Sequence, residues 1–84
     1  MKMSSAANTE IPSFYLVEKL GFTVSKKLIA DTEHWIAKKE ENEFMATGLT
    51  ELLGIIRLYE IKGDGWRATD EEIDKFFEKF STDT

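Results

Sequence analysis

The sequence predicts an all-α fold, a compact bundle of about four short helices with a disordered N-terminal tail. Residues 69–80 carry a helix-start signal followed by an apolar stripe. Residues 25–42 and 47–61 repeat apolar side chains at helical spacing. The chain has 84 residues, of which 42% are hydrophobic, so a single domain with a modest core is expected.

The clearest predicted element is the helix over residues 69–80. Thr69 can cap it, and Glu72, three positions on, can reach back to complete a capping box. A lone helix cannot bury the three phenylalanines that follow, so we expect them to dock on the rest of the chain or on a partner. The apolar positions repeat at i, i+3, i+4 and i+7, and they are Ile73, Phe76, Phe77 and Phe80.

Two further helices are predicted in the first half of the chain. A short one over Pro12–Leu20 has its proline at an early position, where a missing N–H is tolerated, and Gly21 is a natural stop. A longer one is predicted from a Ser25 cap to about Asn42, with lysines and glutamates on its solvent face.

A central helix is predicted from a Thr47 cap to about Ile61, because leucines extend its apolar period upstream. One alternative stays open over residues 55–68. The segment is rich in β-branched and aromatic residues, and the glycines that follow it could turn it into a β-hairpin.

Domain limits and location follow from composition. Nothing in residues 1–10 could pack or serve as a secretory signal, so we expect a disordered tail, then one domain over 11–80 and a short tail over 81–84. No apolar run approaches the roughly 18 to 20 residues that span a bilayer. The chain has no cysteine, which excludes disulfides and cysteine-ligated zinc and fits a cytoplasmic location.

Charge also limits the partners. The formal net charge is -5, and residues 64–84 hold seven acids against three bases. Such a surface repels phosphate backbones and anionic membranes, so no membrane partner is expected.

The residues needed for catalysis or metal binding do not converge. Aligning Gly65 with the glycine of a calcium loop places Lys62 where an oxygen ligand is required. His34 is the only histidine, and it has neither a second histidine nor a cysteine to join it. We therefore predict no catalytic residue, no metal, no cofactor and no enzymatic activity.

Two nucleic-acid-related functions remain as alternatives. The pairs Lys26–Lys27 and Lys38–Lys39 lie on the predicted second helix and could contact DNA or RNA, but the acids between them and the acidic total oppose this. Conversely, the acidic surface could mimic nucleic acid and inhibit a basic enzyme.

The preferred function is a small non-enzymatic protein-interaction module, a regulator or adaptor that binds another protein or itself. Trp66 and Arg67 stand together in a glycine-rich turn, and these two residue types are enriched at binding hot spots. Phe80 and Phe44 are weaker candidates of the same kind. The competing interpretation is that Trp66 folds back as a lid on the last helix.

Overall fold

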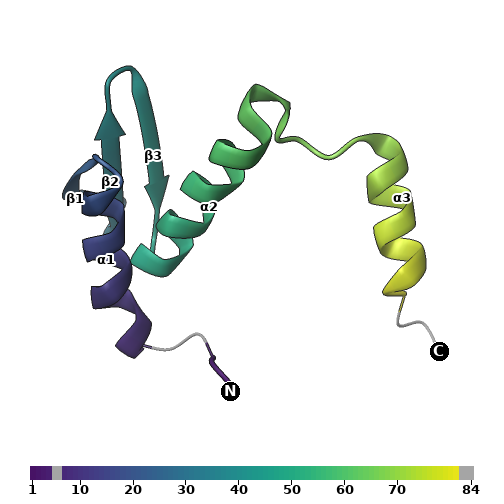
Figure 1. Cartoon of the computed structure of the whole chain (residues 1–84), viewed down its shortest axis with the longest axis horizontal. Helices are drawn as coiled ribbons and strands as arrows, with labels where there is room; N and C mark the ends of the chain where they lie inside the picture. The colour runs from purple at the N-terminus through teal and green to yellow at the C-terminus, as the bar shows by residue number, and fades with distance from the viewer. Residues whose placement is uncertain (5–6, 82–84) are drawn as a thin grey trace.

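The structure, a computed structural model, describes residues 1–4 and 7–81 and has an α+β fold (Figure 1). The all-α prediction is therefore wrong, and so is the bundle of four helices. In chain order the elements are η1 (Ala7–Thr9), α1 (Glu10–Lys19), β1 (Thr23–Ile29), β2 (Thr32–Lys39), β3 (Asn42–Ala46), α2 (Leu49–Lys62), η2 (Gly63–Gly65) and α3 (Asp70–Lys79).

The three strands form an antiparallel sheet in the order β1-β2-β3. Each hairpin has a two-residue loop, since Ile29 pairs with Thr32 and Lys39 pairs with Asn42. In the first loop both central residues have positive φ, 49° and 66°, as a type I′ turn requires. In the second loop Glu40 has a φ of 56°. These turns match the twist of the strands that they join.

The predicted helix over residues 25–42 is wrong, because this segment forms most of β1, all of β2, the turns on either side of β2 and the first residue of β3. Ser25 is not a helix cap but a strand residue opposite Ile36. The apolar pairs Leu28–Ile29 and Trp35–Ile36 are seven residues apart, which fits a helical stripe. They fit two strands equally well, since each pair places one side chain on either face of the sheet.

The other two helices near the core are confirmed. α1 covers the predicted range within a few residues, and Gly21 follows it with a φ of 99°. α2 is a helix and residues 55–68 do not form a hairpin. Its N-cap, however, is Gly48 rather than the predicted Thr47, and that glycine offers no side chain to the helix.

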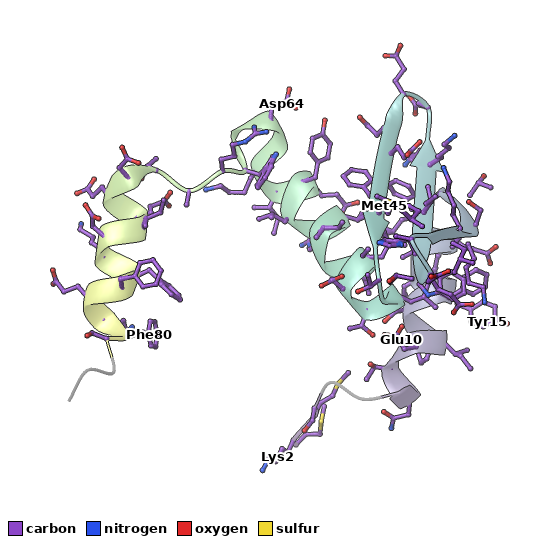
Figure 2. The ribbon with its side chains drawn as sticks, turned by 180° about the vertical axis from the view of Figure 1, so that it is seen from behind. Lys2, Glu10, Tyr15, Met45, Asp64 and Phe80 are labelled. Carbon is purple, nitrogen blue, oxygen red and sulfur yellow. The ribbon has the colours of Figure 1, made fainter. Side chains whose placement is uncertain are left out.

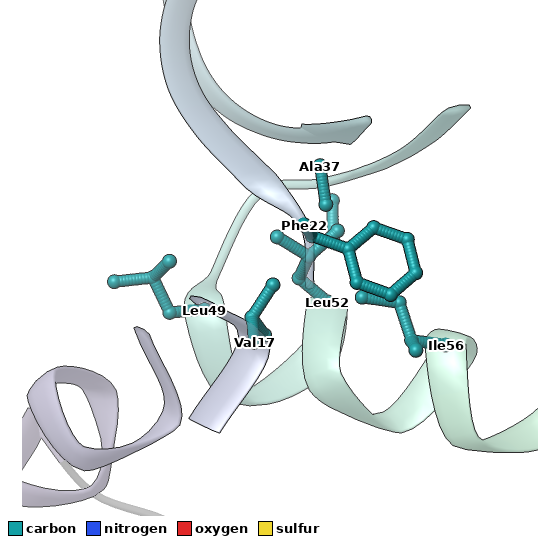
Figure 3. Close-up of a cluster of buried hydrophobic side chains, with 7 residues drawn as sticks. Val17, Phe22, Ala37, Leu49, Leu52 and Ile56 are labelled. Carbon is teal, nitrogen blue, oxygen red and sulfur yellow. The ribbon is translucent and has the colours of Figure 1, made fainter. Parts of the chain in front are cut away.

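The core lies between one face of the sheet and the helices α1 and α2, which pack on each other (Figure 3). Val17 of α1 and Leu52 and Ile56 of α2 have no exposed surface. Ala37 of β2 is also fully buried and belongs to the same cluster. The remaining buried members of the cluster are Phe22, Ala46 and Leu49.

The carboxylate of Glu10 joins the start of α1 to the start of α2. Its Oε1 accepts a hydrogen bond from the backbone N–H of Leu49 at 2.6 Å, and its Oε2 accepts one from Thr50 at 3.0 Å. These bonds hold the pKa of Glu10 below its ordinary value, and the Leu49 N–H contributes most. Glu10 thus supplies the cap that Gly48 cannot.

We call the sheet with α1 and α2 the body of the protein. α3 stands apart from this body at the end of an extended segment (Figure 1). Its predicted capping box is confirmed: the N–H of Glu72 donates to Thr69 Oγ1 at 3.1 Å, and the Thr69 N–H donates to Glu72 Oε1 at 2.8 Å. Every residue of α3 is exposed. The helix is therefore formed as predicted, but its apolar stripe does not join the core.

Candidate functional site

The phenylalanines of α3 form an exposed aromatic cluster on a helix that is otherwise charged. Phe77 is 64% exposed, and Phe76 and Phe80 are each 57% exposed. The ring centroid of Phe76 lies 5.4 Å from that of Phe77 and 5.1 Å from that of Phe80. Figure 2 shows these side chains on the separated helix, with Phe80 labelled. We call Ile73, Phe76, Phe77 and Phe80 the α3 apolar face.

Trp66 lies between the body and α3. It directly follows η2 and is 44% exposed, and the guanidinium carbon of Arg67 lies 4.6 Å from its ring centroid. This is a cation–π contact within one surface segment, so the two residues present a single flat, cationic and aromatic unit. The sequence prediction placed these two residues together, and the structure has them in contact.

A hollow of about 420 Å³ connects Trp66 to the α3 apolar face. Leu58 and Lys62 of α2 form one wall, Trp66 lies between, and Ile73, Phe76 and Phe77 form the other wall. On the body side, Trp66 and Leu58 also line a second hollow of about 330 Å³ with Phe44 and Tyr59. We call the α3 apolar face together with Trp66 and Leu58 the α3 surface.

Charges on α3 are divided between its two halves. The first five residues carry four acids, Asp70, Glu71, Glu72 and Asp74, whereas the second half carries Lys75 and Lys79 together with the acid Glu78. The Thr69 N–H lowers the pKa of Glu72 most, and attraction to Lys62 at the end of α2 lowers it further. Lys79 Nζ lies 5.6 Å from the ring centroid of Phe80. The apolar face thus has a strongly acidic first end, while both lysines of the helix lie in its second half.

The four lysines proposed for nucleic-acid binding do not form one basic face. Neighbouring strand residues point to opposite sides of a sheet, so each pair is divided between the two faces. Lys26 pairs with Glu33 at 3.3 Å, and Lys38 pairs with Glu43 at 3.5 Å. Lys39 donates to the carbonyl of Leu20 at 2.9 Å, and Lys27 is exposed on β1.

Phe44 and His34, which the sequence analysis also considered, do not belong to the α3 surface. Phe44 is partly buried against the core, with its ring centroid 5.7 Å from that of Phe22 and 5.5 Å from that of Tyr59. His34 lies on β2 rather than on a helix, and its Nδ1 is 2.9 Å from the Thr32 carbonyl oxygen. Within residues 1–4 and 7–81, no three histidine, aspartate or glutamate side chains gather closely enough to hold a metal ion.

The sequence predicted Trp66, Arg67 and Phe80 as binding residues but left open whether the α3 stripe docks on the rest of the chain or on a partner. Ile73, Phe76 and Phe77 are in fact exposed, as is Leu58 of α2. One sequence feature could have indicated this exposure. The glycine-rich break at residues 63–65 separates the most amphipathic segment from the apolar centre of the chain.

Comparisons with models of protein families, with curated proteins and with solved structures find no match to this chain. Among helices in the described residues, none combines the length and apolar composition needed to cross a membrane.

The exposure of α3 gives a direct expectation for stability. Phe77→Ala should leave the free energy of unfolding of the body within about 0.5 kcal/mol of the parent, because the ring packs on no core residue. Urea unfolding in dilute solution, followed by circular dichroism, measures this. A loss of several kcal/mol would show that α3 docks on the body.

Proposed function

We propose that this chain is a small non-enzymatic protein-interaction module that binds a protein through the α3 surface. The observation that carries the proposal is an aromatic face, more than half exposed at three phenylalanines, on a capped helix set apart from a folded body. Such a contiguous apolar patch is uncommon on monomeric proteins and typically marks an interaction site. A regulatory or adaptor role in the cytoplasm fits the small size and the absence of cysteine.

The spacing of the apolar residues supports a helix-in-groove mode of recognition. Anchors at i, i+3, i+4 and i+7 lie along one side of a helix and can enter a hydrophobic groove of a partner. Ile73 and Phe80 would be the outer anchors, and the two central phenylalanines would fill the deepest positions. Trp66 and Arg67 extend the contact beyond the helix with residue types that dominate binding energy at interfaces.

The two alternatives receive less support. For nucleic-acid binding, three of the four lysines would have to leave the carboxylates and the carbonyl that they now contact. For nucleic-acid mimicry, carboxylates should be spread over one continuous surface. The densest group instead lies on the first turn of α3, where acids stabilise the helix dipole.

Site-specific photo-cross-linking in the native host tests the proposal. A benzophenone amino acid in place of Phe77 should give ultraviolet-dependent adducts, because this ring is 64% exposed on the proposed interface. The matched control places the same group at Tyr15, an aromatic residue of α1 that is 62% exposed but remote from α3. Mass spectrometry of the adducts identifies the bound protein.

A second experiment combines the substitution Trp66→Ala with the cross-linking amino acid at position 77. Trp66→Ala should reduce the adduct yield about tenfold or more while leaving the unfolding curve of the body unchanged. Equal adduct formation from positions 77 and 15 would contradict the proposal. Retained adducts with a large loss of stability would show that Trp66 is a lid of the core instead.

A further inference from the structure

We infer that the protein bound by the α3 surface is a second copy of this chain, with the two α3 helices packed antiparallel. This inference rests on the proposed function and names its partner. A two-fold arrangement uses the same patch on both chains, so it requires a surface that is complementary to itself. The following features of α3 satisfy that requirement.

Charge polarity makes the helix complementary to its own reverse. The first half carries four acids and no base, whereas the second half carries both lysines of the helix, Lys75 and Lys79, against the single acid Glu78. Antiparallel packing places the acidic half of one helix beside the lysine-bearing half of the other at both ends of the contact. Parallel packing would place the two acidic first turns together, which is unfavourable.

Position around the helix strengthens this argument. At 3.6 residues per turn, Glu72 and Lys79 are seven positions apart and border the same side of the α3 apolar face. When two such helices pack antiparallel, the residues that border this side of one apolar face lie beside the residues that border the same side of the other. Glu72 of each chain therefore lies near Lys79 of the other. Glu72 is exposed even though its Oε1 accepts the capping bond from Thr69, so its carboxylate charge lies on the surface of the helix.

The size of the apolar surface fits a weak, reversible dimer. With 150 to 250 Å² for a whole aromatic side chain, the exposed fractions give the α3 surface roughly 600 Å² of accessible apolar area. Two copies would bury about 1,200 Å², the lower limit for specific interfaces. The hollow between α2 and α3, about 420 Å³ in volume, provides space for aromatic side chains of the second copy.

The isolated state of α3 also favours a symmetric partner. A helix of ten residues is marginal in water without tertiary packing, and here every residue is exposed. Two α3 helices that pack on each other would each gain the packing that the body of its own chain does not provide.

Sedimentation equilibrium of the full chain tests the inference. Between low micromolar and millimolar concentration the apparent mass should rise reversibly from 9.7 kDa to twice that value. The double variant Phe76→Ser/Phe77→Ser should remain monomeric throughout, because it loses the centre of the interface. Tyr15→Ser, which removes an equally exposed ring of α1, should dimerise like the parent.

Charge variants test the antiparallel orientation. Lys79→Glu should weaken the dimer about tenfold, because Glu72 of each chain would then face an acid of the other. Lys27→Glu on β1 changes the net charge equally and should have a much smaller effect. Added salt should weaken the parent dimer, since it screens attraction between opposite charges. A parallel dimer would instead be strengthened by salt and indifferent to the α3 lysines.

Several outcomes would overturn the inference. These are a monomer at all concentrations, a dimer that survives loss of both phenylalanines, or the salt response of a parallel pair. If the chain is monomeric while the cross-linker at position 77 still captures a different protein, the self-association inference fails and the proposed function stands. If position 77 captures nothing above the control, both fail.

Discussion

Leu52→Ala is expected to destabilise the protein by about 3 kcal/mol, within the range of 2 to 5 kcal/mol seen for buried leucines. Leu52 has no exposed surface and lies in the cluster formed by α1, α2 and the sheet (Figure 3). Truncation removes buried methyl groups and leaves a cavity that the surrounding strands and helices cannot fill completely. In a domain of this size the loss is a large part of the total stability.

Urea unfolding followed by circular dichroism measures the loss, and Leu58→Ala is the matched control. Leu58 lies on the same helix but is 42% exposed, so the same substitution should cost less than about 1 kcal/mol. Similar losses for the two variants would contradict the assignment of the buried face of α2.

Glu10→Ala is expected to destabilise the protein by about 2 kcal/mol. The substitution leaves the N–H groups of Leu49 and Thr50 without the carboxylate that accepts their hydrogen bonds. It also removes a negative charge from the positive end of the α2 dipole. Glu10→Gln keeps one acceptor without the charge, so its stability should lie between those of the parent and the alanine variant.

The pH dependence of this contribution has a definite sign. Because the folded state lowers the pKa of Glu10, its stabilisation is fully present above the ordinary glutamate pKa. It is lost as the pH falls through the lowered pKa, where the carboxylate becomes protonated. The stability difference between the parent and Glu10→Gln should therefore shrink over this acidic range. A difference that stays constant with pH would show that the carboxylate is not linked to folding.

Structural features that depend on contacts between residues close in the sequence could be predicted, whereas features that depend on distant residues could not. The capping box was predictable because Thr69 and Glu72 are three residues apart and satisfy each other. The cap that Glu10 supplies to α2 was not predictable, since it joins residues 39 and 40 positions apart. No local pattern marks such a bond.

The hairpins were missed because their turns lack the usual glycine and asparagine. Ala30 and Glu40 adopt positive φ, although glycine, asparagine and aspartate are the residues that favour it, and only Asp31 among the turn residues is of that type. Because these usual turn residues are missing, the sequence of residues 25–42 resembles that of one amphipathic helix. Tertiary contacts decide between the two structures: Ala37 and Trp35 contribute to the face of β2 that packs on the core.

The candidate site was predicted in part for a related reason. Trp66 and Arg67 were identified from residue type and a neighbouring break in the chain. The exposure of Phe76 and Phe77 could not be read from their spacing, because the same stripe can cover a core or meet a partner. Only the position of α3 relative to the body distinguishes the two.

The order of the strands has a consequence for the chain during its synthesis. Each strand pairs only with its neighbour in the sequence, so the partner of β2 and then of β3 has already been made when that strand appears. No strand has to be inserted between two others. α1, in contrast, is made first and must wait for α2, because the groups that bind Glu10 belong to residues 49 and 50. All three strands are therefore synthesised before the residues that hold the first helix in place.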